Sequence, residues 1–255
     1  MPRLAHLTSP EAREALTRAR LAIVATGSLE QHGPHLALET DAAIAGEFAE
    51  RLAAELGEDA VYCPPLAYGL SEHHLAFPGT VTLRPATFLG FLADLVESLA
   101  HWGVRRLLVV NGHGGNVDAI RLAARAARRD QGALVAGLLW AQVAADRIAE
   151  RVESERYGHA CEVETSVAMV LAPGCVHADR IGPPRMRPPF DPLTDPPGAS
   201  IDRPVWFEEW TEDGALGDAR RSSRELGEAV VELAYERAVA FARRFAEEPL
   251  PERGT

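Results

Sequence analysis

Short apolar runs that end in small or polar residues constrain the fold of this chain more than any other sequence feature. The clearest run is Leu21–Ala25, which ends at Thr26-Gly27. A second run, Leu107–Val110, is followed by Asn111-Gly112, and a third spans 134–139. Continuous runs of this length are typical of strands that are buried on both faces. The chain is therefore predicted to contain a central, mainly parallel sheet.

Helical patterns alternate with these runs. Ser9-Pro10-Glu11 predicts a helix start, because it combines a capping hydroxyl, a proline in the first turn and an acid near the positive end of the helix dipole. Apolar side chains recur at helical spacing over 48–56, 88–99 and 226–239. Strands that alternate with helices predict an α/β fold of three layers, in which helices cover both faces of the sheet.

The 255 residues are predicted to form one domain, 1–255. The hydrophobic content of 47% is sufficient for a sizeable core. Prolines cluster over 182–204 and exclude a regular helix or strand there, so an irregular excursion is expected. An interdomain linker is the alternative, but only one further helical pattern follows the prolines.

Composition argues against several classes of partner. The chain carries 26 basic and 37 acidic residues, and its formal charge of -11 repels nucleic acid and anionic lipid. The amino terminus lacks the apolar core of a secretory signal, and no apolar run is long enough to span a membrane. Three cysteines without metal-finger spacing favour reduced thiols. We therefore expect a cytoplasmic protein that binds neither nucleic acid nor membranes.

Candidate metal ligands follow the first predicted strand. This segment contains Glu30 and His32, and Asp41 opens the next predicted helix. Alternate side chains of an extended backbone share a face, so Glu30 and His32 can point into one site. Imidazole and carboxylate groups together suit divalent cations, and a carboxylate such as Asp41 can bridge two of them. A solvated polar loop is the alternative interpretation of this segment alone.

Two further polar segments carry possible chemistry. Asn111–Asn116 follows a predicted strand, and His113 is its only strong metal donor. Phosphate binding is the rival, but Gly-x-x-x-x-Gly-Lys does not occur. The third segment, 159–165, contains His159, Glu162 and Glu164. The two glutamates diverge if a helix starts here, so one of them is expected to face solvent.

Taken together, these segments resemble the signatures of the creatininase family. The similar blocks are 27–36 with Asp41, 68–80, 111–116 and 159–166, in the family's order, and 214–218 is similar less distinctly. The resemblance implies a metal-dependent amidohydrolase with a creatininase-like α/β fold. Such an enzyme cleaves a carbon–nitrogen bond with hydroxide held between two divalent cations (Zn, Mn or Fe). The resemblance also implies a homo-oligomer such as a hexamer.

The same resemblance assigns individual residues. Glu30, Asp41 and His113 would hold one metal, and His32 with the bridging Asp41 would contribute to a second. Creatinine-hydrolysing members carry a tyrosine and a glutamate after the histidine, where this chain has two glycines, 114 and 115. Creatinine is therefore not the expected substrate.

Two more residues receive roles at this stage. Since His32 and Asp41 alone would hold the second cation weakly, we expect Glu164 to complete that site or to transfer protons, with Glu162 pointing elsewhere. His159 is expected to protonate the leaving nitrogen.

Several activities stay open at this stage. A small amide or formamide is the expected substrate, and a peptidase that trims a cofactor precursor is the alternative within the family. A serine hydrolase would use Ser28 or Ser71, which lie near histidines, although no Gly-x-Ser-x-Gly motif is present. A noncatalytic metal-binding assembly protein would account for the missing loop glutamate.

Other conspicuous residues receive no role. His74 matches a family position, but it and His73 could be ordinary surface histidines. A role for His35 in supporting the ligands and a plain loop position are equally compatible with the sequence. Trp206 and Trp210 could line a pocket, although aromatic residues more often pack into a core.

Overall fold

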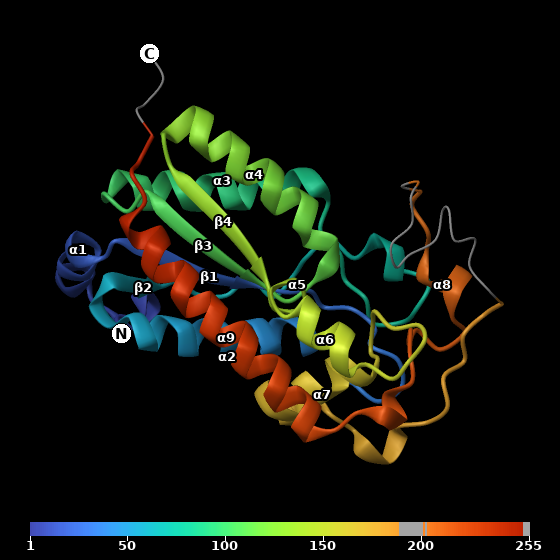
Figure 1. The fold of residues 1–255 in the computed structure, drawn as a ribbon. Helices are drawn as coiled ribbons and strands as arrows, with labels where there is room; N and C mark the ends of the chain where they lie inside the picture. Colours follow the sequence, from blue (N-terminus) through green and yellow to red (C-terminus); the bar gives the residue numbers. More distant parts are fainter. Residues whose placement is uncertain (189–200, 202, 252–255) are drawn as a thin grey trace.

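The computed structural model describes residues 1–188, 201 and 203–251, so much of the predicted excursion at 182–204 lies outside the described residues (Figure 1). The prediction of a single domain over 1–255 stays a prediction. The helices and strands in chain order are α1 (Ser9–Arg18), β1 (Leu21–Thr26), α2 (Thr40–Leu56), β2 (Ala60–Tyr62), α3 (Pro85–His101), β3 (Arg106–Asn111), α4 (Val117–Gln131), β4 (Leu134–Leu139), α5 (Trp140–Val143), α6 (Ala145–Arg151), α7 (Glu162–Leu171), α8 (Phe207–Trp210) and α9 (Arg224–Glu247).

The sheet has the strand order β2-β1-β3-β4, and every neighbouring pair is parallel. In the central pair, Ala25 of β1 lies opposite Val110 of β3. The predicted parallel sheet is therefore confirmed, with β2 as a short additional strand. Because parallel strands end at the same edge of a sheet, the loops after β1 and β3 emerge side by side.

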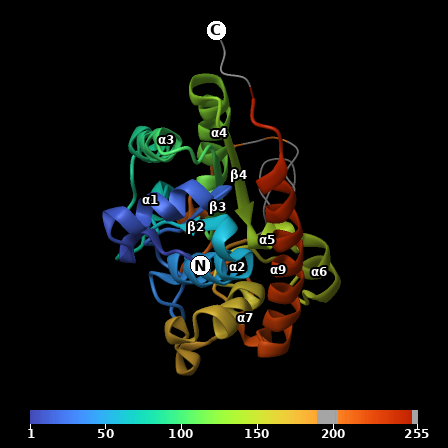
Figure 2. The same cartoon turned by 90° about the vertical axis from the view of Figure 1, so that its left-hand side faces the viewer.

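Two hydrophobic cores enclose the sheet. Ile23 and Ala25 of β1 belong to the core beneath α2, α7 and α9, whereas Ala22 and Val24 belong to the core beneath α3 and α4. This alternation follows from the two-residue period of a strand. The helices lie on opposite sides of the sheet (Figure 2). The predicted three-layer arrangement is confirmed.

Local signals at the helix ends agree with the structure to within a residue. Thr8, rather than Ser9, is the N-cap of α1, and its main-chain N–H donates to the Glu11 carboxylate at 2.7 Å. The second helix begins at Thr40, which places Asp41 in its first turn. That position brings Asp41 to the edge of the sheet where β1 and β3 end.

Helices α7 and α9 approach each other closely at Gly227. A Cβ atom at this position would lie 2.0 Å from the main-chain oxygen of Ser166. The Ser166 hydroxyl in turn accepts a hydrogen bond from the main-chain N–H of Ser223 at 2.9 Å. A residue without a side chain is needed here, and the contact fixes α7 against the rest of the molecule.

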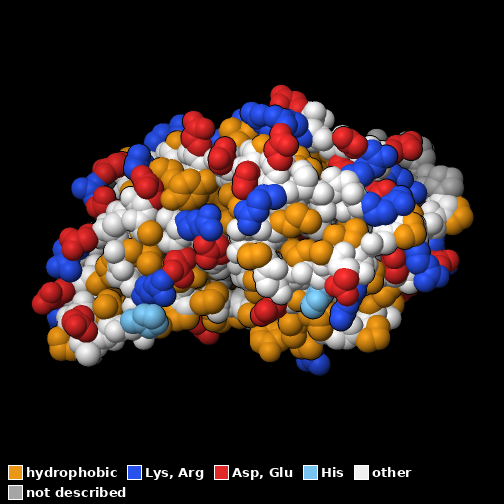
Figure 3. Space-filling view, turned by 90° about the horizontal axis from the view of Figure 1, so that it is seen from below, with side chains coloured by type: hydrophobic (Ala, Val, Ile, Leu, Met, Phe, Trp, Pro, Cys, Tyr) orange, Lys and Arg blue, Asp and Glu red, His pale blue; other side chains and the backbone are white. Residues whose placement is uncertain are grey.

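The surface is mixed in character. Arginine and acidic side chains are interspersed over the face shown in Figure 3, with hydrophobic side chains between them. Among the described residues, no helix is long and apolar enough to cross a membrane.

Candidate metal centre

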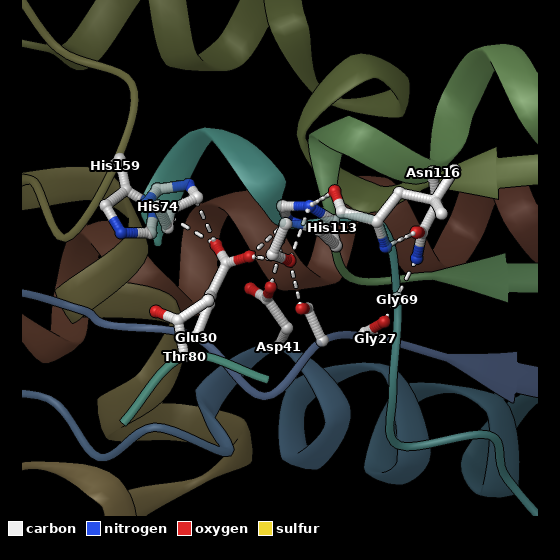
Figure 4. Close-up of polar contacts among 12 residues, drawn as sticks. Gly27, Glu30, Asp41, Gly69, His74, Thr80, His113, Asn116 and His159 are labelled. Atoms are coloured by element: carbon white, nitrogen blue, oxygen red, sulfur yellow. Dashed lines mark hydrogen bonds and ion pairs between the residues drawn. The ribbon is translucent and has the colours of Figure 1, made fainter. Parts of the chain in front are cut away.

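Six acidic and histidine side chains converge at the edge of the sheet where β1 and β3 end. Figure 4 shows four of them, Glu30, Asp41, His113 and His159. Two follow β1, one opens α2, one follows β3, and two lie at or just before the start of α7: Glu30, His32, Asp41, His113, His159 and Glu164. All six are buried, with Glu164 the most accessible at 8%. Burial of three carboxylates is costly unless cations or protons compensate their charge.

The first group joins the loops after β1 and β3. His113 Nδ1 lies 3.1 Å from Glu30 Oε2 and 3.2 Å from Asp41 Oδ2 (Figure 4). The other ring nitrogen of His113 donates to the main-chain oxygen of Leu70 at 2.8 Å. Burial opposes the charged ring, but the Glu30 and Asp41 carboxylates outweigh it and raise the pKa of His113 well above its usual value. Nδ1 therefore carries a proton in the metal-free centre and offers a lone pair once a cation displaces that proton. Three converging acceptors form a suitable place for a cation.

The second group consists of His32, Asp41 and Glu164, and its histidine is oriented in the same way as His113. His32 Nδ1 donates to the main-chain oxygen of Glu30 at 3.1 Å. Its Nε2 lies 3.1 Å from Asp41 Oδ1 and 3.8 Å from Glu164 Oε1. The two oxygens of Asp41 thus face different histidines, as a carboxylate shared between two cations would.

His159 lies between the two groups. Its Nε2 donates to the main-chain oxygen of Gln31 at 2.7 Å. Its Nδ1 is 3.7 Å from Glu30 Oε1 and 3.9 Å from Glu164 Oε2. These contacts leave a ring nitrogen with a lone pair beside both candidate cation positions.

Glu162 and Glu164 diverge, but neither faces solvent. Glu162 is 1% exposed, and its carboxylate accepts hydrogen bonds from the main-chain N–H groups of Glu153 and Ser154. Glu164 faces His32 instead. The expectation that one of the pair is solvent-facing was wrong, because the 153–154 loop folds over the start of α7 and supplies donors to Glu162.

The electrostatics of the centre reflect this crowding. Burial favours neutral His32, but the Asp41 carboxylate outweighs it and raises the pKa of His32 to about 10. Burial raises the pKa of Glu164 to about 7 and lowers the pKa of His159 to about 3. Without a cation, protons on histidine and Glu164 therefore neutralise the buried carboxylates.

Two carboxylate oxygens in the centre lack hydrogen bonds among the described residues. These are Glu30 Oε1 and Asp41 Oδ2, and both are fully buried. A buried carboxylate oxygen without a donor is strongly destabilising unless a cation or water completes its surroundings. The donor set of oxygen and nitrogen atoms fits a borderline divalent metal such as zinc, manganese or iron.

The hydroxyl of Ser71, a candidate nucleophile of a serine hydrolase, donates to a carboxylate and not to a histidine base. Its hydroxyl donates to Glu30 Oε2 at 2.5 Å and contacts the hydroxyl of Ser28. His113 Nε2 lies 3.2 Å from Ser71 Oγ, but its proton is directed to Leu70, so it cannot remove the serine proton. The geometry therefore does not favour a serine hydrolase.

Sequence reasoning left out three residues that border the centre. Gln31 and His74 are buried and joined by a hydrogen bond of 2.7 Å. Phe207 stacks on His74, with ring centroids 3.9 Å apart, and also contacts His159. A signal for His74 existed in the 68–80 block, whereas nothing in the sequence placed Phe207 near the histidines.

The remaining candidates lie outside the centre. His35 is buried, and its Nε2 is hydrogen-bonded to the Thr165 hydroxyl at 2.9 Å. Trp210 packs in a small core with Phe207 and Leu216, while Trp206 is 41% exposed.

The glycine loop after His113 has one crowded and one open position. A Cβ atom at Gly115 would lie 2.3 Å from the Leu70 oxygen and 2.4 Å from His113 Nε2. A Cβ atom at Gly114 would meet nothing within 4 Å. The hydrogen bond that orients His113 therefore requires glycine at 115, and a glutamate there would displace it.

The parallel sheet and the buried carboxylate–histidine cluster define an α/β protein with a candidate metal centre. The chain matches the family model Creatininase, described as creatinine amidohydrolase, over residues 5–242. The mycofactocin precursor peptide peptidase of Mycolicibacterium smegmatis is 36% identical over 182 residues, which are 69% of this chain and 67% of that protein. The creatinine amidohydrolase of Pseudomonas putida is 31% identical over 227 residues, which are 81% and 82% of the two chains.

A solved structure described as "Creatininase Mn" has a TM-score of 0.76 and 29% identity, and the match covers 94% of this chain and 97% of that chain. The chain belongs to the creatininase family and is an amidohydrolase of that family. The resemblance found in the sequence blocks is thereby confirmed.

Proposed function

We propose that this chain is a metal-dependent amidohydrolase that cleaves the carbon–nitrogen bond of a small amide or formamide other than creatinine. Glu30, Asp41 and His113 would hold one divalent cation. His32, Asp41 and Glu164 would hold a second. These sets are two of the three groups whose ligand atoms lie within 4.8 Å of one another.

One observation carries this proposal. His32, His113 and His159 each donate one ring N–H to a main-chain carbonyl and present the other nitrogen to carboxylates. Metal-binding histidines characteristically donate their second nitrogen in this way, because the hydrogen bond fixes ring orientation and tautomer. Main-chain carbonyls thus orient His32 and His113 for the two cations and His159 for proton transfer beside them.

The cations would supply Lewis-acid activation of water and of the substrate carbonyl. The Gln31 carbonyl accepts the Nε2 proton of His159 and leaves Nδ1 with a lone pair beside the centre. Nδ1 could therefore accept a proton from the attacking water and return it to the leaving nitrogen. Glu164 lies 3.9 Å from this nitrogen and can either bind metal or assist the transfer.

The glycine loop argues against creatinine as the substrate. By the family resemblance, creatinine-hydrolysing members would carry a glutamate at the position of Gly115. In this chain a Cβ atom there would meet the Leu70 oxygen and the His113 ring. Glu164, at 3.8 Å from His32, is the carboxylate positioned to replace that glutamate.

A second candidate substrate is the end of a peptide. The relative at 36% identity is a peptidase of a mycofactocin precursor peptide. The position of Gly114 is open and exposed, whereas the family resemblance implies a tyrosine there in creatinine-hydrolysing members, so the loop after His113 leaves room for a larger group.

Turnover by metal-stripped and reconstituted protein tests the proposal. We expect zinc, manganese or iron to restore hydrolysis of an N-formyl amine or a short peptide, with creatinine turned over at least tenfold more slowly. A protein that binds metal and hydrolyses none of these compounds would point to a noncatalytic assembly protein. Activity that persists without metal would contradict metal dependence.

The variants Glu164→Gln and Glu162→Gln separate the roles of the two glutamates. If Glu164 binds metal, Glu164→Gln lowers both metal content and activity. If it only transfers protons, activity falls and the metal content stays. Glu162→Gln is the matched control, because Gln can still accept the hydrogen bonds from the 153–154 loop. Unchanged metal content and activity in Glu164→Gln would exclude both roles.

We further propose that the chain forms a homo-oligomer, with the hexamer implied by family resemblance as the expected state. Multi-angle light scattering of the purified protein measures this directly.

A further inference from the structure

The side-chain amide of Gln31 is held in one orientation. Its Oε1 accepts the main-chain N–H of Gly33 at 2.9 Å, and its Nε2 donates to the main-chain oxygen of Gly214 at 3.0 Å. Main-chain groups cannot exchange donor and acceptor roles, so the amide cannot be flipped. Gly214 closes over this amide, since a Cβ atom there would lie 1.7 Å from Gln31 Oε1.

This orientation determines where His74 carries its proton. Gln31 Nε2 also donates to His74 Nδ1 at 2.7 Å, so that nitrogen is an acceptor. The proton of a neutral ring must then be on Nε2, which lies 3.3 Å from Glu30 Oε1.

The main-chain carbonyl of Gln31 orients His159 so that its unprotonated nitrogen, and not its N–H, faces the centre. The Gln31 carbonyl accepts the Nε2 proton of His159, which leaves Nδ1 with a lone pair toward Glu30 and Glu164. The two rings are neighbours, with centroids 4.5 Å apart. One residue therefore places an N–H and a lone pair side by side at the edge of the centre.

We propose that Gln31 is a positioning residue that fixes the tautomers of two histidines, so that His74 presents an N–H donor and His159 presents a proton acceptor. The His74 N–H lies beside Glu30 Oε1 at the edge of the centre, and His159 Nδ1 is the proton acceptor next to it. The inference deepens the proposed function, because it assigns proton positions at that site. Its test does not require turnover, so its failure is distinguishable from failure of the proposed activity.

Nitrogen-15 NMR of the ring nitrogens tests this assignment in metal-free and zinc-loaded protein. We expect both His74 and His159 to be protonated on Nε2, with the His74 signals assigned by their loss in His74→Phe. A wild-type His74 ring protonated on Nδ1 would overturn the proposal, and this result needs no variant to fold.

The variant Gln31→Met separates the two effects of Gln31. It removes the side-chain amide and keeps the main-chain carbonyl, so His74 should lose its single tautomer while His159 keeps its own. The exposed Gln142→Met is the matched control and should change neither ring. If Gln31→Met leaves the His74 nitrogen shifts unchanged, the amide does not set the tautomer and the proposal fails.

Discussion

At the scale of single residues, the centre depends on which groups can donate and which can only accept. Asp41 illustrates this most clearly, because its two oxygens lie 3.1 Å from His32 and 3.2 Å from His113. Each histidine faces a different oxygen of Asp41, so neither can take the position of the other. The carboxylate is therefore common to both candidate cation positions.

The first prediction concerns the sharing of Asp41. Asp41→Ala should lose both metals, whereas His32→Ala or His113→Ala should lose mainly one, because a shared carboxylate also screens the repulsion between the cations. Metal content per chain, measured by mass spectrometry of the digested protein, provides the comparison. Equal metal content in Asp41→Ala and His113→Ala would show that Asp41 serves one cation only.

The second prediction is that metal binding releases protons. The pKa of His32 is raised to about 10 and that of Glu164 to about 7, so at pH 7 His32 is protonated and Glu164 is protonated in roughly half of the metal-free molecules. A cation must displace these protons, and metal affinity should fall as the pH is lowered from 8 to 6. Calorimetry in two buffers of different ionisation enthalpy measures the release. A binding enthalpy that is the same in both buffers would contradict the prediction.

At the scale of elements, sequence predicts those helices and strands whose pattern lies within a short stretch of the chain. The apolar runs predicted β1 and β3, since a strand buried on both faces must be apolar throughout. The run over β4 also formed a strand, but the expectation that it is buried on both faces was wrong, because β4 lies at the edge of the sheet and is only partly buried. The strand β2 has only three residues, too few for a pattern to be detectable. Phe207 could not have been placed by sequence, because its neighbours His74 and His159 are far away along the chain.

The third prediction concerns the contact between α7 and α9. Gly227→Ala should destabilise the fold by about 1–3 kcal/mol, because its Cβ would lie 2.0 Å from the Ser166 oxygen. Gly46→Ala in α2, where a Cβ meets nothing within 4 Å, should instead stabilise by up to about 1 kcal/mol. Urea unfolding of the two variants measures both effects. Similar changes in the free energy of unfolding of the two variants would mean that α7 and α9 can move apart without destabilising the fold.

At the scale of the whole molecule, the candidate centre connects the two central strands, β1 and β3, to helices α2 and α7. Its six side chains come from four separate parts of the chain, and the blocks around them carried the family resemblance. The ligands could therefore be proposed from sequence. Their hydrogen bonds to main-chain oxygens could not, because every residue has a main-chain oxygen and the residue type does not show which one will accept.

The fourth prediction follows from this bridging position. A metal at 100 times its dissociation constant should stabilise the fold by about 2.7 kcal/mol, because it binds the folded chain and not the unfolded one. The melting temperature should therefore rise when zinc is added to stripped protein and fall again with a chelator. Asp41→Ala is the control that should show no such shift. A wild-type melting temperature that does not respond to metal would contradict the prediction.

The distance along the chain between the first and last ligands also has a consequence for synthesis. Glu30 is made early, but Glu164 becomes available only after β3, α4 and β4 have been translated. A nascent chain that ends before α7 contains Glu30, Asp41 and His113 but lacks the last donor of the second position. The second position can therefore be completed only once nearly two thirds of the chain has been synthesised.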